Sequence, residues 1–217
     1  MNIAIIIPAY NPPNTFSSLI ENISILTNNH LIIVDDGTIP PIDIKQKNIT
    51  LIRNKINHGK GYALKKAFNH AFNEGFTHAI TLDADSQHDP SLIKAFSIID
   101  EDISMVLGTR NFSREMPFHR RLSNFLTSKV ISYLCKVTIL DSQCGYRRYK
   151  LIDLASKSFI ENGFQFESEV LIKLLRNKIS VKTLEIPTTY NNEKSAINNF
   201  LDTYKFIRLI CRNLIKK

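Results

Sequence analysis

The sequence has few cysteines, and their spacing rules out the common cysteine-based scaffolds. Cys135, Cys144 and Cys211 are odd in number, form no CxxC pair and have no histidine nearby at zinc-ligand spacing. We interpret them as reduced thiols. A chain of 217 residues with 43% hydrophobic residues can bury a core without disulfides or a structural metal. We therefore expect one globular domain.

The chain also lacks any apolar stretch that approaches the roughly 20 residues needed to span a bilayer. Its first residues lead directly into a strand-like run, without the basic segment and cleavage site of a secretory signal. Gly/Ser linkers, internal repeats and low-complexity segments are absent as well. These features predict a cytoplasmic protein, whose contact with the inner face of the cell membrane would be peripheral or through a membrane-protein partner.

Basic residues outnumber acidic ones, which gives a net charge of +8 and a pI near 9.4. Such a charge favours polyanionic partners, namely nucleic acid, phospholipid headgroups or phosphorylated small molecules. Charge alone does not choose among them.

Short β-branched runs alternate with amphipathic helical patterns through the first half of the chain. Apolar runs predict strands, and positions repeating near every 3.6 residues predict helices. The expected strands are 3–7, 31–34, 50–52, 79–82 and 104–107, and the expected helices are 15–26, 61–72 and 91–99. This alternation predicts an α/β fold with a mostly parallel sheet and helices on both faces.

Polar motifs follow the ends of four of these predicted strands. Because ligands of such sheets bind beyond the carboxyl ends of the strands, we expect the motifs to converge on one cleft. They are residues 8–11, 35–37, 83–85 and 108–110.

Asp83 and Asp85 lie two residues apart at a strand end, so in extended geometry their carboxylates point to the same side. Two carboxylates can share one hard cation such as Mg²⁺ or Mn²⁺, and Gln87 can add a carbonyl oxygen. The alternative is an acidic turn that caps the helix after Pro90. The density of polar residues favours the metal site.

Three further motifs suggest contacts with phosphates or a nucleotide. Residues 57–61 (NHGKG) precede a helix, so free N–H groups and Lys60 can hold an anion, although a plain glycine-rich helix start is the alternative. Asp35 and Asp36 can accept hydrogen bonds from a nucleoside or form an ordinary turn. Arg110, Arg147 and Arg148 are candidates for phosphate binding, because a guanidinium group matches phosphate oxygens. The alternative is that they are ordinary solvated surface charges.

Taken together, the ordered motifs resemble a family-2 glycosyltransferase of the GT-A (Rossmann-like) fold, most like the branch of dolichyl- and polyprenyl-phosphate hexose synthases. The resemblance covers residues 3 to about 195. The motifs are 7–11 (IPAYN), 34–37 (VDDG), 57–64 (NHGKGYAL), 83–90 (DADSQHDP), 108–110 (GTR), 141–147 (DSQCGYR), 164–169 (FQFESE) and 185–187 (EIP).

The resemblance implies roles for residues at these positions. Asp83, Asp85 and Gln87 would hold Mg²⁺ or Mn²⁺, with Asp85 at the catalytic centre. Arg110 and Arg147 would contact phosphates. The nucleotide-sugar donor would lie against Pro8, Tyr10, Asn11, Asp35, Asp36, Lys60, Asp83 and Ala84. The family's usual Ser-Thr-Asp after Asp-Asp-Gly is replaced here by residues 38–41 (TIPP), which leaves the nucleobase open.

The resemblance also implies an inverting transfer of a hexose to an acceptor, in which the metal stabilises the departing diphosphate. A hydroxyl acceptor needs a general base, for which Asp141, Glu167 and Glu169 are candidates. A phosphate acceptor, such as a polyprenyl phosphate, is already an anion and needs none. Arg147 and Arg148 would then position it.

The second half of the chain is expected to bind the acceptor. The prediction is a catalytic domain over 1–195, with a donor half (1–115) and an acceptor half (116–195), and a basic amphipathic helix over 196–217. A helical stretch at 119–137, a helix near 169–176 and a terminal helix from about 197 are expected. The first and last are basic and amphipathic, which suits either an anionic membrane surface or packing on the core.

Other classes explain less of the sequence. A sugar nucleotidyltransferase would carry a glycine-rich basic loop after its first strand, where residues 8–13 read PAYNPP. A basic nucleic-acid-binding module would explain the charge but not the paired carboxylates, so no nucleic-acid partner is expected. A donor-binding protein without catalysis is a further alternative.

Overall fold

The computed structural model describes residues 1–111, 118–177, 179–187 and 199–215. Its central strand, β1 (Ile3–Ala9), is apolar on both faces. Ile5 and Ile7 belong to one buried cluster, and Ala4 and Ile6 belong to a second. Because successive side chains of a strand point to opposite faces, β1 supplies both layers of the core.

The sheet has the strand order β3-β2-β1-β4-β6-β5-β7. Only β6 runs antiparallel to its neighbours, so the predicted mostly parallel sheet is confirmed. The other strands all end at one edge. They are β2 (His30–Asp36), β3 (Ile49–Asn54), β4 (His78–Thr81), β5 (Met105–Arg110) and β7 (Val181–Ile186), while β6 spans Arg147–Lys150.

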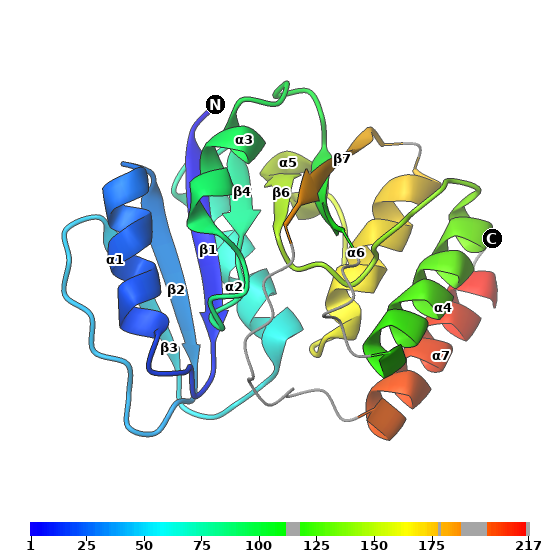
Figure 1. Cartoon of the computed structure of the whole chain (residues 1–217), viewed down its shortest axis with the longest axis horizontal. Helices are drawn as coiled ribbons and strands as arrows, with labels where there is room; N and C mark the ends of the chain where they lie inside the picture. The colour runs from blue at the N-terminus through cyan, green and yellow to red at the C-terminus, as the bar shows by residue number, and fades with distance from the viewer. Residues whose placement is uncertain (112–117, 178, 188–198, 216–217) are drawn as a thin grey trace.

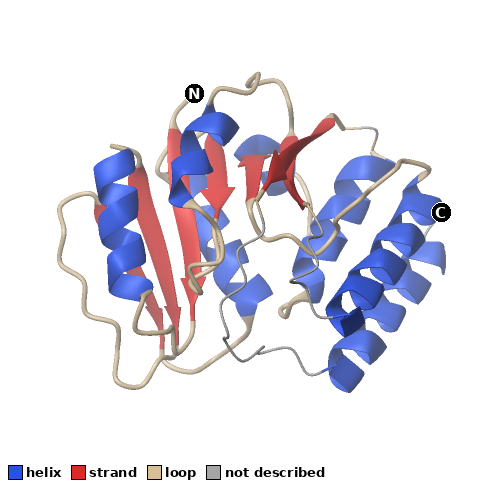
Figure 2. Ribbon diagram, in the orientation of Figure 1, coloured by secondary structure: helices blue, strands red, loops and turns tan. Residues whose placement is uncertain are grey.

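Helices cover both faces of the sheet, as predicted (Figures 1 and 2). One face carries α1 (Phe16–Leu26) and α3 (Ile93–Ser97), the latter after a single 3₁₀ turn, η1 (Pro90–Leu92). The other face carries α2 (Lys60–Asn73), α4 (Phe118–Cys135), α5 (Leu151–Ala155), α6 (Gln165–Arg176) and α7 (Asn199–Ile215). The chain forms one domain.

The five predicted strands and the six predicted helices are present, with most ends shifted by a few residues. The terminal helix is described from Asn199, so its predicted start near residue 197 lies outside the described residues. The prediction missed β6, β7 and α5. In β6 the sequence RRYK reads as a polar surface segment, yet its first three residues are buried.

Helix α4 has its polar and apolar sides reversed relative to an ordinary surface helix. Its inward side includes Asn124 and Ser128, which are 0% and 3% exposed. Its outward side includes Leu122, Phe125 and Tyr133, which are 45%, 54% and 87% exposed. The apolar stripe seen in the sequence therefore points mainly to solvent rather than to the core. Among the described helices, none is both long and apolar enough to cross a membrane.

Candidate active site

Lys60, the first residue of α2, joins two of the predicted motifs at the carboxyl edge of the sheet. Its Nζ lies 2.6 Å from Oδ1 of Asp83, after β4, and 3.1 Å from Oε1 of Glu167 in the first turn of α6. A third motif closes over them at Gly145, where a Cβ would meet Oδ2 of Asp83 at 2.7 Å and Nζ of Lys60 at 3.0 Å. Only glycine leaves room for this contact.

The charges in this cluster are held in their ionised forms. Burial would lower the pKa of Lys60, but the carboxylates of Asp83 and Glu167 raise it well above its usual value. Burial would raise the pKa of Asp83, but Lys60, His88 and Arg110 bring it down to about 2. An anionic Asp83 is therefore present at every pH at which the protein is expected to work.

The turn after β4 holds the three predicted metal ligands, Asp83, Asp85 and Gln87. The backbone N–H of Gln87 donates to Oδ1 of Asp85 at 3.1 Å, and Ser86 takes a left-handed conformation with φ of 60°. Nδ1 of His88 accepts from the backbone N–H of Asp83 at 3.2 Å. Burial lowers the pKa of His88 to about 4, so the ring is neutral and keeps this lone pair as an acceptor.

The donor set fits a metal ion that shares its shell with a substrate. Asp83 and Asp85 are partly buried, and both provide oxygen ligands. Among the described residues no group of three His, Cys, Asp or Glu side chains surrounds a metal position. Mg²⁺ and Mn²⁺ suit such a site, because Mg²⁺ keeps several waters and commonly bridges one or two carboxylates to substrate phosphates. Ala84, between the two carboxylates, packs against the core.

Asp35 and Asp36 shape loops rather than face the cleft. Asp36 is 3% exposed; its Oδ2 accepts from the backbone N–H groups of His58 and Gly59, at 3.1 and 2.7 Å. Asp35 is 0% exposed and accepts from the backbone N–H of Thr38 at 2.8 Å and from the Arg53 guanidinium. The predicted direct contact with a nucleoside does not fit this burial, and both carboxylates instead hold the loops at this edge.

The loop after β1 presents the remaining predicted nucleoside contacts. Tyr10 is 50% exposed, next to the partly buried Pro8. Asn11 ties this loop to the next one, because its backbone N–H donates to Oγ1 of Thr38 at 3.0 Å and its Oδ1 accepts from Ile39 at 3.3 Å. The structure thus places Tyr10 on a surface shared by the loops after β1 and β2.

Asp141, predicted as a candidate general base, is a saturated hydrogen-bond acceptor in the structure. Its two oxygens accept six hydrogen bonds, three from Arg110 and one each from Asn124, Gln143 and Cys144. Burial would raise its pKa, but the bonds from Arg110 and Asn124 lower it. Asp141 is 0% exposed. The carboxylate of Asp141 therefore orients Arg110 at the end of β5. Its buried, fully hydrogen-bonded oxygens are poorly placed to take a proton from an acceptor.

Arg147 and Arg148, predicted to bind phosphates, are instead buried parts of the scaffold. Both are 0% exposed. Arg147 donates at 2.7–2.8 Å to three backbone carbonyls, those of Ser142, Cys144 and Glu167. Arg148 donates to the carbonyls of Phe96, Ile99, Asp100 and Ile103. Five of these seven carbonyls belong to residues outside regular helices and strands, where the backbone lacks regular partners, and the two guanidinium groups donate to them.

Glu169 is also part of the scaffold. It is 1% exposed and accepts from the backbone N–H groups of Ile160 and Glu161, at 2.9–3.1 Å. Its Oε1 also pairs with Lys173 at 2.7 Å. Glu167, two residues earlier, is the member of this motif that reaches the cluster.

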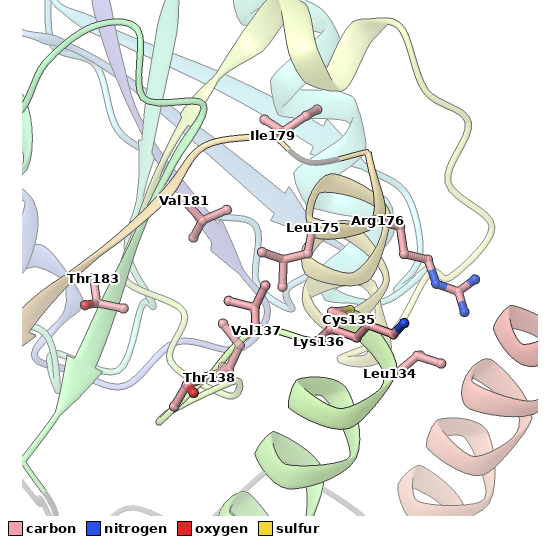
Figure 3. Close-up of a pocket in the computed structure, with 11 residues that line it drawn as sticks. Leu134, Cys135, Lys136, Val137, Thr138, Leu175, Arg176, Ile179, Val181 and Thr183 are labelled. Carbon is pink, nitrogen blue, oxygen red and sulfur yellow. The ribbon is translucent and has the colours of Figure 1, made fainter.

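A cavity elsewhere in the described part of the chain does not adjoin these motifs. It has a volume of about 610 Å³ and lies between the ends of α4 and α6 and the first half of β7 (Figure 3). Val181 and Thr183 line it, whereas the candidate site adjoins the carboxyl end of the sheet. We therefore do not assign it to the site.

Several residues that position the site residues were not predicted from the sequence. It gave no role to His88, Gly145, Arg53 or Asn124. His88 stood inside a recognised motif, and its position after the paired aspartates was the available signal. The partners of Arg53 and Asn124 lie 18 and 17 residues away, so only folding brings them together.

Comparisons with known proteins identify the family of this chain. The model of the family described as "Glycosyl transferase family 2" matches residues 4–158. A UDP-N-acetylglucosamine–dolichyl-phosphate N-acetylglucosaminyltransferase of Methanococcus voltae is 27% identical, over 89% of this chain and 88% of the relative. An undecaprenyl-phosphate 4-deoxy-4-formamido-L-arabinose transferase of Proteus mirabilis is 24% identical, over 96% of this chain and 64% of the relative.

Solved structures show the same fold. Glucosyl-3-phosphoglycerate synthase of Mycobacterium tuberculosis, in complex with Mn²⁺, UDP-glucose and phosphoglyceric acid, superposes with a TM-score of 0.76 at 15% identity, covering 98% of this chain and 79% of that one. A complex of the same enzyme with Mg²⁺ and UDP gives a TM-score of 0.72 at 16% identity, covering 99% and 78%.

The scaffold role of Arg147 predicts a loss of stability on substitution. Arg147→Met keeps much of the volume but leaves three buried carbonyls unpaired, so we expect the free energy of unfolding to fall by about 3 kcal/mol or more. Arg121→Met, on an exposed position of α4, should change it by less than about 0.5 kcal/mol. Urea unfolding measures both. Equal stability of the two variants would refute the assignment.

Proposed function

This chain belongs to glycosyl transferase family 2, and we propose that it moves a hexose from a nucleotide-diphosphate sugar to a polyprenyl-phosphate acceptor at a membrane surface. The names of two relatives, which pair a sugar transferase with dolichyl or undecaprenyl phosphate, support this acceptor class. The observation that carries the proposal is the state of the three carboxylates that were candidates for a general base.

All three of these carboxylates are engaged within the protein. Asp141 accepts six hydrogen bonds, Glu169 caps two backbone N–H groups, and Glu167 pairs with Lys60. A hydroxyl acceptor needs such a base to take its proton, whereas a phosphate acceptor attacks as an anion. The arrangement therefore favours a phosphate oxygen as the nucleophile.

The donor half of the site would lie over residues 1–115. Asp83, Asp85 and Gln87 would hold Mg²⁺ or Mn²⁺, as expected from the donor set, and the solved relatives contain these ions with UDP. When bound, the ion would neutralise the diphosphate that departs. Tyr10 and the loop of Asn11 would contact the nucleoside, beside loops whose backbone N–H groups are held by Asp35 and Asp36.

The transfer is one displacement in this scheme. An acceptor phosphate oxygen forms a bond to the anomeric carbon while the bond from that carbon to the diphosphate oxygen breaks. Lys60, at the amino end of α2, adds a positive charge beside Asp83, where negative charge would develop on the leaving diphosphate. Arg110, oriented by Asp141, would contact phosphate from the end of β5. Acceptor contacts would come mainly from residues 116–195.

Two helices of the second half present the surface that we assign to the membrane. Exposed apolar side chains on α4 and α7 include Phe125, Tyr133, Tyr204 and Ile207, between 54% and 87% exposed. Basic residues accompany them, and α4 contains no acidic residue. Both helices pack on α6 at one end of the sheet (Figure 1). An apolar face with a basic fringe complements anionic lipid, where each nearby Lys or Arg contributes about 1 kcal/mol.

Replacement of a metal ligand should remove activity and leave the fold. Asp85→Ala should lower the rate of sugar transfer on the order of 1,000-fold, because the metal contributes several kcal/mol of transition-state stabilisation. Mn²⁺ binding in the presence of UDP or GDP, followed by calorimetry, should weaken in parallel. Asp43→Ala, whose carboxylate is 78% exposed, is the matched control. Full activity of Asp85→Ala would contradict the metal assignment.

The acceptor class is tested with matched lipids. Purified protein, Mn²⁺ and a panel of nucleotide sugars are incubated with a polyprenyl phosphate or with the corresponding polyprenol. We expect glycolipid only from the phosphate, since the candidate bases are engaged. A product from the polyprenol at a comparable rate would show that a base is available and would overturn the acceptor proposal.

The membrane face is tested by co-sedimentation with vesicles. We expect binding to vesicles that contain anionic lipid, weaker binding to zwitterionic vesicles, and a decline as salt is raised. Phe125→Ser combined with Tyr204→Ser should weaken binding about 10-fold or more. Ile25→Ser, which removes an 81% exposed side chain from α1, should have no effect. Absence of binding to either vesicle would rule out this surface.

A further inference from the structure

The turn between α5 and α6, residues 161–165, is held from one side by α7. Glu161 is only 4% exposed, and its carboxylate pairs with Arg212 and, at 3.5 Å, with Arg208. These two arginines lie one helical turn apart on α7. Glu161 is therefore a buried charge whose counterions come from a helix about fifty residues later in the chain.

A second contact fixes the same turn to the beginning of α7. Nε2 of Gln165 donates to Oδ1 of Asp202 at 2.9 Å and to its backbone carbonyl at 3.2 Å. Leu209, between the two attachment points, is fully buried. Helix α7 thus contacts both ends of the 161–165 turn, through the ion pairs with Glu161 and the hydrogen bonds from Gln165.

The other side of the turn forms the support of the predicted anion-binding loop. The backbone N–H of Tyr62 donates to the carbonyl of Asn162 at 3.0 Å. A Cβ on Gly59 would lie 2.6 Å from that carbonyl oxygen. A Cβ on Gly61 would lie 2.8 Å from the carbonyl oxygen of Gly163. The start of α2 and the turn are therefore in backbone contact, without side chains between them that could absorb a displacement.

This contact bears on Lys60 directly. Lys60 stands between the two glycines, and its ammonium meets Glu167, two residues after the turn. A shift of the turn would move the support of the loop and the Glu167 partner of Lys60 together. The position of Lys60 over Asp83 is thus fixed from α6 as well as from β4.

We propose that Glu161, gripped by Arg208 and Arg212, is a positioning residue for the donor site, through which α7 sets the geometry of residues 59–62. A buried ion pair is weak evidence for stability, because desolvation cancels much of its attraction. Its effect here is to specify where the turn lies.

The first test needs no ligand. Amide hydrogen exchange of the whole protein is compared for wild type, Glu161→Gln and Arg208→Gln/Arg212→Gln. We expect exchange at residues 59–63 to increase about 10-fold in both variants, with β1 and β2 unchanged. Lys205→Gln removes one charge from the same helix outside this ion pair and should leave exchange unchanged.

Three outcomes decide the proposal. Faster exchange in 59–63 in both variants, with no further increase when the substitutions are combined, supports a shared path. Faster exchange confined to α7, or spread equally over β1 and β2, would overturn it, because the ion pair would then serve only α7 or global stability.

The second test measures nucleotide binding and rests on the proposed function. UDP and GDP are titrated into each variant with Mn²⁺ by calorimetry. We expect Kd for the nucleotide that binds wild type to rise about 5- to 10-fold, and Arg212→Lys to restore part of the loss. An unchanged Kd would overturn the positioning role. Failure of wild type to bind either nucleotide would count against the proposed function, and hydrogen exchange would then decide the positioning role alone.

Discussion

The ammonium of Lys60 is the contact on which the site depends. It lies between Asp83 after β4 and Glu167 in α6, so a single charge links the two halves of the chain. Without it, two carboxylates would face each other in a partly buried place, which is costly. The pairing also shows that the position beside the Asp83 carboxylate attracts cations. The same negative charge is the one that a metal ion needs from the protein when it bridges to a diphosphate.

Many of the polar side chains around this contact bind loop backbone rather than face the cleft. Asp36 fixes the backbone N–H groups before α2, Asp141 fixes Arg110, and Arg147 collects three carbonyls. These groups are buried, and a buried polar group is tolerated only when it is hydrogen-bonded. A phosphate-binding edge made of loops needs such internal partners, because loop backbones lack the ladders of helices and sheets. The consequence is a site in which few charged side chains remain to meet substrate.

The second half of the chain adds a surface and a support. Helix α4 turns Asn124 and Ser128 inward to the 141–144 loop and leaves its aromatic side chains outside. Helix α7 packs on α6 and pairs with Glu161 beneath the donor loop. The surface that we propose for the acceptor and residues 59–62 are therefore parts of one packed body. A lipid acceptor would approach from the side on which both helices are exposed.

The sequence by itself determined the fold class and the place of the site. Alternating strands and helices predict the parallel sheet, and motifs at strand ends such as Asp83 and Asp85 predict the edge at which ligands bind, because both follow from local periodicity. It could not determine which charged residues face that edge. Arg147 and Arg148 look like phosphate ligands in sequence, and β6 looks like a surface segment. Their side chains are satisfied by backbone carbonyls that lie 20 and 52 residues away in the chain. The tertiary structure alone brings those carbonyls to them, since hydrogen-bond partners at long separation leave no periodic signal.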